Sequence, residues 1–227
     1  MSTLYVVATP IGNLEDITYR AVRILTEVDC ILCEDTRMTK RVLDHYDIDT
    51  PVLSYHAHSD TSRSDNIIKR LEEGESMALV SDAGTPTISD PGVQLVDRIH
   101  QELADEVQVV AVPGPSALTA AFSIAGVAGN QFVFMGYLPH KKGRETLFTE
   151  ISTTTRPVVF YESPHRIAKT LHSLVDHLSP NRRVIVAREL TKIHEEVVRG
   201  NAKELEDYYL AHPDKVRGEF VVIVDTE

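Results

Sequence analysis

Short apolar runs alternate with amphipathic stretches along the first half of the chain. The runs lie at residues 4–8, 30–33, 52–55, 77–80 and 107–112, and several are rich in β-branched residues, which is typical of strands buried in a parallel sheet. Between them, apolar positions recur at helical spacing over residues 17–28, 67–71 and 93–103. This alternation predicts β-α-β units with right-handed crossovers and places ligand-binding loops at the carboxyl ends of the strands.

The pattern changes at Pro113-Gly-Pro-Ser116, which precedes a helix of small residues at 116–125. We therefore expect an N-terminal domain at 1–112 and a C-terminal domain at 113–227, with a connector at 136–143. The second domain is expected to hold strands at 157–161, 184–187, 197–199 and 219–224 and helices at 166–178 and 202–211. The predicted fold class is α/β, with a mostly parallel N-terminal sheet and a mixed C-terminal sheet in which the last strands pair antiparallel.

The composition is typical of a globular protein, with 42% hydrophobic and 25% charged residues in a chain of 227. The N-terminus lacks the basic segment and cleavage site of a signal peptide. The longest weakly polar stretch, at 117–129, is too short to span a bilayer. These features predict a cytoplasmic protein without a membrane segment.

The net charge of −11 argues at first against a nucleic-acid partner. However, residues 1–112 hold 9 Lys and Arg against 20 Asp and Glu, whereas residues 113–227 hold 14 of each. A polyanion must therefore be bound by local basic groups in the second half. Each basic cluster alone is more commonly a solvated surface, but together they form the only plausible phosphate-binding surface of this acidic chain.

Two pairs of potential metal ligands occur in the first half. Cys30 and Cys33 form a C-x-x-C motif, but residues three apart in a strand point to opposite faces, so we interpret both as core residues. His56 and His58 face one side of an extended segment, yet no third ligand is evident, which favours a polar or surface role. We expect no metal site.

The loop from Ser81 to Gly92, with the sequence SDAGTPTISDPG, is the strongest candidate for ligand binding. Gly84 permits close approach of the backbone to a ligand, and Asp82 or Asp90 can accept hydrogen bonds from hydroxyl or amino groups. The alternative is a structural loop in which Asp90 is the N-cap of the next helix. The length of the loop and its density of turn residues favour a binding loop.

Other predicted strand ends also carry polar motifs. Thr9–Asn13 and Pro113–Ala117 fit neither the dinucleotide-binding nor the P-loop pattern, and Leu118 removes the nucleophile-elbow pattern. Glu34–Arg37 suits acid–base chemistry or substrate orientation on one interpretation, and a helix N-cap with a local ion pair on the other. Similar arrangements recur in the second half at 160–166 and 187–192.

Six segments, taken in order, resemble the signature blocks of the ribosomal RNA small subunit methyltransferase I family of the tetrapyrrole methylase superfamily. They are TPIGNLEDIT, EDTR, SDAGTPTISDPG, PGPSALTAA, FYESPHR and ARELTK. The resemblance covers residues 4 to about 224 and implies two α/β/α domains, S-adenosylmethionine as the cofactor and a homodimer. Family members commonly continue into a small C-terminal helical domain that helps to hold RNA, and we expect this domain to be absent here.

The resemblance also implies a set of cofactor-binding residues, carried over motif by motif. They are Pro10, Asp82, Ala83, Gly84, Thr85, Ser116, Ala117, Tyr161 and Gly218.

The activity implied by the resemblance is 2′-O-methylation of a cytidine in the decoding centre of 16S rRNA, within the small ribosomal subunit. The ribose hydroxyl would attack the sulfonium methyl group in line, with positioning and desolvation supplying most of the acceleration. The candidates for the base that removes the hydroxyl proton are Glu34, Asp35 and His165. The side chains expected to contact RNA are Arg37, Lys141, Lys142, Arg144, Arg166, Arg188 and Lys192.

Two alternatives stay open on the sequence. A tetrapyrrole or diphthamide-type methyltransferase of the same superfamily would keep the cofactor and change the acceptor, although the basic second half and the long loop argue against it. A non-catalytic ribosome-assembly factor would bind the ribosome without binding the cofactor.

Overall fold

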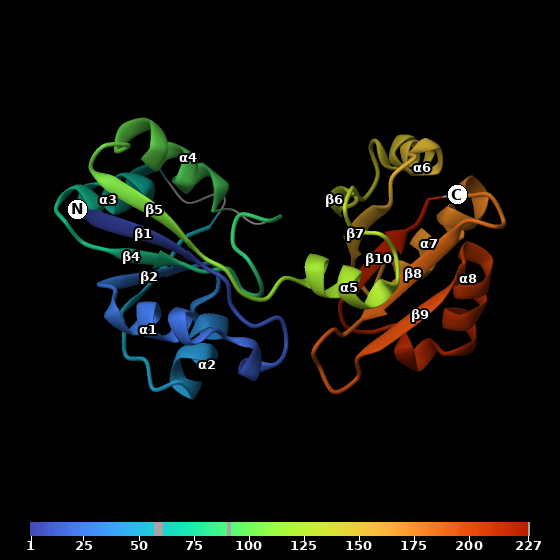
Figure 1. Cartoon of the computed structure of the whole chain (residues 1–227), viewed down its shortest axis with the longest axis horizontal. Coiled ribbons are helices and arrows are strands. Elements are labelled where there is room, and N and C mark those ends of the chain that lie inside the picture. The colour runs from blue at the N-terminus through green and yellow to red at the C-terminus, as the bar shows by residue number, and fades with distance from the viewer. Residues whose placement is uncertain (57–60, 90–91, 227) are drawn as a thin grey trace. The chain divides into compact units, whose positions relative to one another are not determined.

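The computed structural model describes residues 1–56, 61–89 and 92–226, which form two compact units, Met1–Ser116 and Ala117–Glu227 (Figure 1). The division between the units follows Ser116 in the sequence, a few residues beyond the predicted boundary at residue 112. Every helix among the described residues is too short or too polar to cross a membrane.

The first unit is a five-stranded parallel sheet with the strand order β3-β2-β4-β1-β5. Its strands are β1 (Ser2–Val7), β2 (Cys30–Cys33), β3 (Val52–Ser54), β4 (Met77–Leu79) and β5 (Val107–Val112). The helices between them are η1 (Leu14–Asp16), α1 (Tyr19–Glu27), α2 (Thr36–His45), α3 (Thr61–Glu72) and α4 (Val93–Glu102). The predicted β-α-β alternation is confirmed, and the carboxyl ends of all five strands meet at one edge of the sheet.

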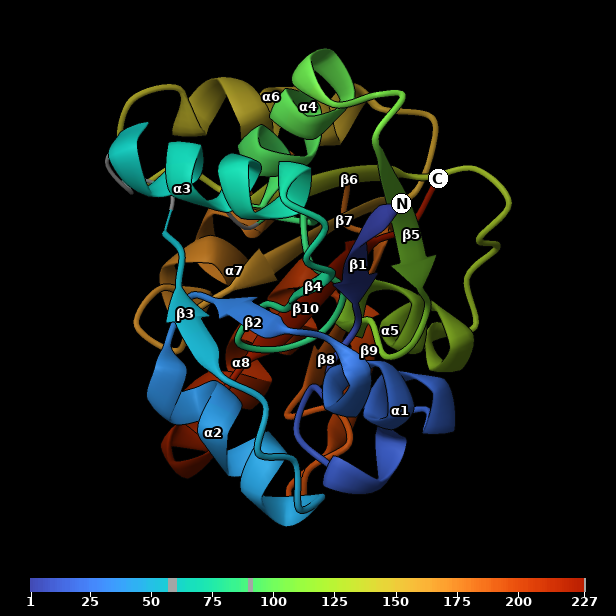
Figure 2. The ribbon, with the colours of Figure 1, turned by 90° about the vertical axis from the view of Figure 1, so that its left-hand side faces the viewer.

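Helices cover both faces of this sheet, with α3 and α4 on one face and α1 and α2 on the other (Figure 2). Side chains alternate along a strand, so Cys30 packs beneath α3 and α4 while Cys33 packs beneath α1 and α2. Both cysteines are buried and free. The prediction that their thiols point to opposite faces of the sheet is therefore confirmed.

The second unit contains a five-stranded sheet with the strand order β6-β7-β10-β8-β9. The sheet is mixed, as the sequence predicts. Its strands are β6 (Val133–Tyr137), β7 (Val158–Glu162), β8 (Arg183–Arg188), β9 (Glu196–Asn201) and β10 (Phe220–Val224). Its helices are α5 (Ala117–Ala125), α6 (Arg144–Thr153), α7 (Ile167–His177), α8 (Ala202–Ala211) and η2 (Pro213–Lys215). β6 runs parallel to β7, whereas β10 is antiparallel to β7 and β8, and β9 is antiparallel to β8.

Helices cover both faces of the second sheet as well. Helices α6, α7 and α8 share one core with the sheet, centred on Phe148, Leu171 and Leu205. The alternate strand residues Ile185 and Ile223 are also fully buried, on the face where α5 packs against β8 and β10. Each unit is therefore an α/β/α sandwich.

Two elements of the second unit correct the sequence prediction. The expected connector at 136–143 begins inside β6, whose pairing with β7 shifts register between Phe134 and Tyr137. Gly136 has a φ of 57° at this bulge, which interrupts the period-two pattern by which strands are recognised. Helix α6 also escapes the pattern, because its first residue on the buried side is an arginine, Arg144.

A buried arginine lies at the edge of the second sheet where β8 begins and β10 ends. Arg182 is 1% exposed and donates to the carbonyls of Ser152, Thr154 and Asp225 at 2.7, 3.0 and 2.8 Å. These bonds tie the end of α6 to the sheet. Each buried carbonyl that loses its donor costs about 1–3 kcal/mol.

We expect Arg182→Met to lower the free energy of unfolding by about 3 kcal/mol, because three backbone carbonyls lose a donor. Urea denaturation followed by circular dichroism measures the change. Arg183→Met is the matched control, since the Arg183 side chain is 48% exposed and its pair with Asp225 is worth about 1 kcal/mol or less. Equal losses in the two variants would contradict this account.

Candidate functional site

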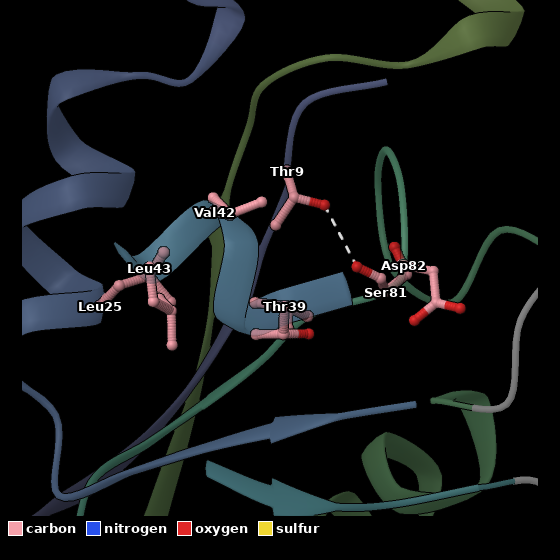
Figure 3. Close-up of a pocket in the computed structure, with 8 residues that line it drawn as sticks. Thr9, Leu25, Thr39, Val42, Leu43, Ser81 and Asp82 are labelled. Atoms are coloured by element: carbon pink, nitrogen blue, oxygen red, sulfur yellow. Dashed lines mark hydrogen bonds between the residues drawn. The ribbon is translucent and has the colours of Figure 1, made fainter. Parts of the chain in front are cut away.

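Three loops interlock at the carboxyl edge of the first sheet. Thr9, after β1, and Gly84, after β4, exchange backbone hydrogen bonds of 2.9 and 3.1 Å. The Thr9 hydroxyl also donates to the Ser81 carbonyl at 3.2 Å (Figure 3). The Thr85 hydroxyl donates to the carbonyl of Pro115, in the loop after β5, at 3.1 Å. We call these joined segments, residues 9–11, 81–85 and 113–115, the cradle.

The cradle needs glycine at position 84. Gly84 has a φ of 82°, in the left-handed region, and a Cβ atom there would lie 3.3 Å from Cγ2 of Ile11. Further along the same loop, Thr87 and Ser89 hold φ values of 71° and 67°, which side chains with a Cβ rarely adopt. Strained backbone of this kind is concentrated at ligand-binding and catalytic sites.

A polar pocket of about 450 Å³ opens at the ends of β2, β3 and β4. Asp82 of the cradle borders it, and its carboxylate accepts a hydrogen bond of 3.0 Å from the Asp35 amide, which ties the β2 and β4 loops together. With three carboxylates and one guanidinium, the lining favours a cation. The lining residues are Glu34, Asp35, Thr36, Arg37, Ser54, His56 and Asp82.

Asp35 has a structural role in this pocket. As the N-cap of α2, its carboxylate accepts from the Arg37 amide at 2.8 Å and from the Arg37 guanidinium at 3.1 and 2.8 Å. The side-chain hydrogen bond from Arg37 lowers the pKa of Asp35 to about 2. A carboxylate with so low a pKa is a weak base.

Three further polar residues considered from the sequence are His56, His58 and Asp90. The Nε2 atom of His56 lies 2.7 Å from the hydroxyl of Ser54, a pocket residue that the sequence analysis missed although it stands at a strand end. His58 and Asp90 lie outside the described residues. Within 1–56, 61–89 and 92–226, no three His, Cys, Asp or Glu side chains are grouped to hold a metal ion.

The second unit also gathers its predicted site residues at one edge, formed by the carboxyl ends of β6, β7 and β8 and the start of β10. The Tyr161 ring packs against the rings of Phe134 and Tyr137, with centroids 5.1 and 5.4 Å apart. His165 is exposed in the loop that follows β7. This edge therefore presents aromatic surface beside polar loops.

Gly218 stands at the same edge and is covered by a side chain that the sequence analysis missed. A Cβ atom at Gly218 would clash with the Glu189 carboxylate, and the φ of Gly218 is 85°. The Glu189 carboxylate accepts from the Glu219 amide at 3.0 Å and from Lys192 at 2.8 Å, and Lys192 also binds the Glu219 carboxylate at 2.9 Å. Lys192 is thus already paired with two carboxylates.

The cofactor-binding residues predicted from the sequence fall in both units. Pro10 and Asp82, Ala83, Gly84 and Thr85 come together in the cradle, and Ser116 closes the first unit directly after it. Ala117, Tyr161 and Gly218 belong to the second unit. The residues that build the cradle itself, Thr9 and Pro115, were not predicted, because their contacts join segments far apart in the sequence.

The side chains predicted to contact RNA differ in their exposure. Lys141 and Lys142 are exposed, and the Arg37 side chain is 87% exposed. The side chains of Arg144, Arg166 and Arg188 are only 5%, 15% and 8% exposed, and they pair with Glu162 or Glu196. Because a buried guanidinium needs its internal partner, this pairing argues against a direct phosphate contact by these three side chains.

The family model of tetrapyrrole (corrin/porphyrin) methylases matches residues 3–206. A ribosomal RNA small subunit methyltransferase I of Xylella fastidiosa is 47% identical over 223 residues, covering 98% of this chain and 81% of that one. The protein of that name from Thermotoga maritima is 43% identical over 224 residues, covering 99% of this chain and 98% of that one.

Solved structures resemble this one at lower identity. A diphthine synthase aligns with a TM-score of 0.74 at 13% identity, over 99% of this chain and 90% of that one. A cobalt precorrin-4 methyltransferase of cobalamin biosynthesis gives a TM-score of 0.71 at 16% identity, over 98% of this chain and 94% of that one. At these identities the likeness shows the fold alone.

We expect Gly84→Ala to destabilise the first unit by about 2 kcal/mol, because a left-handed backbone with a Cβ costs about 1–2 kcal/mol and Ile11 adds crowding. It should also speed hydrogen exchange at the Thr9 amide, which pairs with Gly84. Gly74→Ala is the control, since its φ is 100° but nothing lies within 4 Å of the added Cβ. Faster Thr9 exchange in both variants, measured by NMR, would contradict the role given to Gly84.

Proposed function

Because this chain belongs to the tetrapyrrole methylases and, within them, to the ribosomal RNA small subunit methyltransferase I family, we propose that it methylates a ribose 2′-hydroxyl of a cytidine in the decoding centre of 16S rRNA. The methyl donor is S-adenosylmethionine. The observation that carries the proposal is 47% and 43% identity, over nearly the whole chain, to relatives named as methyltransferases of small-subunit rRNA.

The first unit suits this donor. S-adenosylmethionine carries a sulfonium and an ammonium against one carboxylate, and the polar pocket offers the carboxylates of Glu34, Asp35 and Asp82 against one guanidinium. Gly84 adopts the left-handed φ of the cradle backbone, which a residue with a Cβ rarely adopts. In this proposal the donor is held by Pro10, Asp82, Ala83, Gly84, Thr85, Ser116, Ala117, Tyr161 and Gly218.

Bound in this way, the donor supplies a methyl group already activated by the positive sulfur. The protein must then orient the ribose hydroxyl, exclude water and accept one proton. We assign the proton acceptor to Glu34, which lines the pocket beside Asp82, because Arg37 makes Asp35 too weak a base. His165, exposed in the second unit, is the remaining candidate.

The RNA contacts in this proposal come from the exposed cations Arg37, Lys141 and Lys142, with Lys192 bound to its carboxylates at the same edge as Gly218. A nucleotide splayed out of the rRNA fold would present its ribose, since proteins read RNA mainly through shape and unstacked nucleotides. The proposal includes a homodimer, which the resemblance implies, and a cytoplasmic location.

The proposal is tested by incubating the protein and tritiated S-adenosylmethionine with purified small ribosomal subunits, naked 16S rRNA and a tetrapyrrole in parallel. We expect label in the rRNA of the subunits. Label on the tetrapyrrole alone would overturn the choice of acceptor. Calorimetry with the donor is the second readout, and an absence of binding heat and thermal shift would favour the non-catalytic assembly factor.

We expect Glu34→Gln to lower kcat by about 10²–10⁴, the usual contribution of a general base, at saturating donor and subunit. Asp35→Asn is the matched control and should lower kcat by less than about tenfold, because Asp35 caps α2 and is a weak base. A large loss of kcat in His165→Gln, with the kcat of Glu34→Gln near that of wild type, would contradict this assignment. The base would then be His165.

A further inference from the structure

Glu162, at the end of β7, carries a fully buried charge that the proposed chemistry does not use. Its Oε1 atom lies 2.6 Å from Nε of Arg166 and accepts from the Ser163 amide at 2.8 Å. Its Oε2 atom accepts from the Thr170 hydroxyl at 2.6 Å. Arg144 donates to the same hydroxyl at 2.6 Å and lies 3.8 Å from the carboxylate. One carboxylate thus holds two guanidinium groups.

Both guanidinium groups also donate hydrogen bonds to the loop that follows β6. Arg166 donates to the Leu138 carbonyl at 2.6 Å, and Arg144 donates to the Pro139 carbonyl at 3.2 Å. The remainder of that loop is exposed and carries Lys141 and Lys142. The start of a basic surface loop is therefore tied to a buried carboxylate through two arginines.

The charge of Glu162 is what keeps this arrangement together. Burial lowers the pKa of Arg144, and the nearby Arg166 lowers it further, whereas Glu162 raises it. Without the carboxylate, two partly desolvated cations would face each other, which is strongly unfavourable. They would then separate or turn to solvent and release the two carbonyls.

We propose that Glu162 is a positioning residue for the RNA substrate: through Arg166 and Arg144 it fixes the start of the loop at 138–143, and so holds Lys141 and Lys142 ready for rRNA phosphates. This inference rests on the proposed function of the chain. A loop already held in its binding arrangement loses less conformational freedom when RNA binds, so affinity depends on the buried network. Arg144 and Arg166 then serve RNA binding indirectly.

The test uses Glu162→Gln, which keeps the shape and removes the charge. We expect KM for small subunits to rise about tenfold, while kcat and the Kd for S-adenosylmethionine change by less than about twofold. In a chain that already carries Lys141→Ala and Lys142→Ala, Glu162→Gln should raise KM no further, because the two lysines that Glu162 positions are already gone.

A merely structural role for Glu162 predicts a different pattern. The increase in KM caused by Glu162→Gln and the increase caused by the two lysine substitutions would then multiply in the triple variant. That result would overturn the inference. An unchanged KM in Glu162→Gln, or in the double lysine variant, would overturn it as well. Arg182→Met is the control for lost stability, because Arg182 binds carbonyls at the opposite edge of the same sheet, and its KM should stay within about twofold of wild type.

Thr170→Val tests the same network if Glu162→Gln does not fold. It removes the hydroxyl that links Arg144 to Glu162 and leaves every charge in place, so KM should rise about threefold. A KM equal to wild type would contradict the inference. If the wild-type chain methylates no subunits, the proposed function itself has failed, so that failure is distinguishable from failure of the positioning role.

Discussion

The exchange of backbone hydrogen bonds between Thr9 and Gly84 is the contact on which the first unit's site depends. It joins the loops after β1 and β4, and the Thr85 hydroxyl extends the joint to the loop after β5. Because β4, β1 and β5 are adjacent in a parallel sheet, their carboxyl ends must emerge side by side. The Thr9–Gly84 bridge fixes the adjacent loops relative to one another. A side chain at position 84 would destabilise this bridge, because it would strain the left-handed backbone and crowd Ile11.

Charge is arranged differently in the two units. In the first unit, acidic groups remain at the surface of a pocket, where they suit a cationic donor. In the second unit, cations and carboxylates balance, and the arginines nearest the site are turned inward against Glu162 and Glu196. Other cations of the second unit, among them Lys141 and Lys142, are exposed. The same residue types thus pair internally when buried and face solvent when exposed.

Local patterns in the sequence were sufficient to predict the strands of the first sheet, the mixed second sheet and the opposite faces of Cys30 and Cys33. Strand β6 escaped because the bulge at Gly136 breaks the alternation. The burial of Arg144 and Arg166 also escaped, because their partner Glu162 is brought to them only by tertiary packing. Motifs located the candidate site, while the pairings that decide which charges are free arise from contacts between distant segments.

The proposed activity places a methyl group on the 2′-oxygen of a cytidine in 16S rRNA. Mass spectrometry of nucleosides from small subunits incubated with the protein and S-adenosylmethionine tests it most directly. We expect 2′-O-methylcytidine that forms only when both protein and donor are present. Methylation of a base, or no new methylated nucleoside despite donor binding, would contradict it.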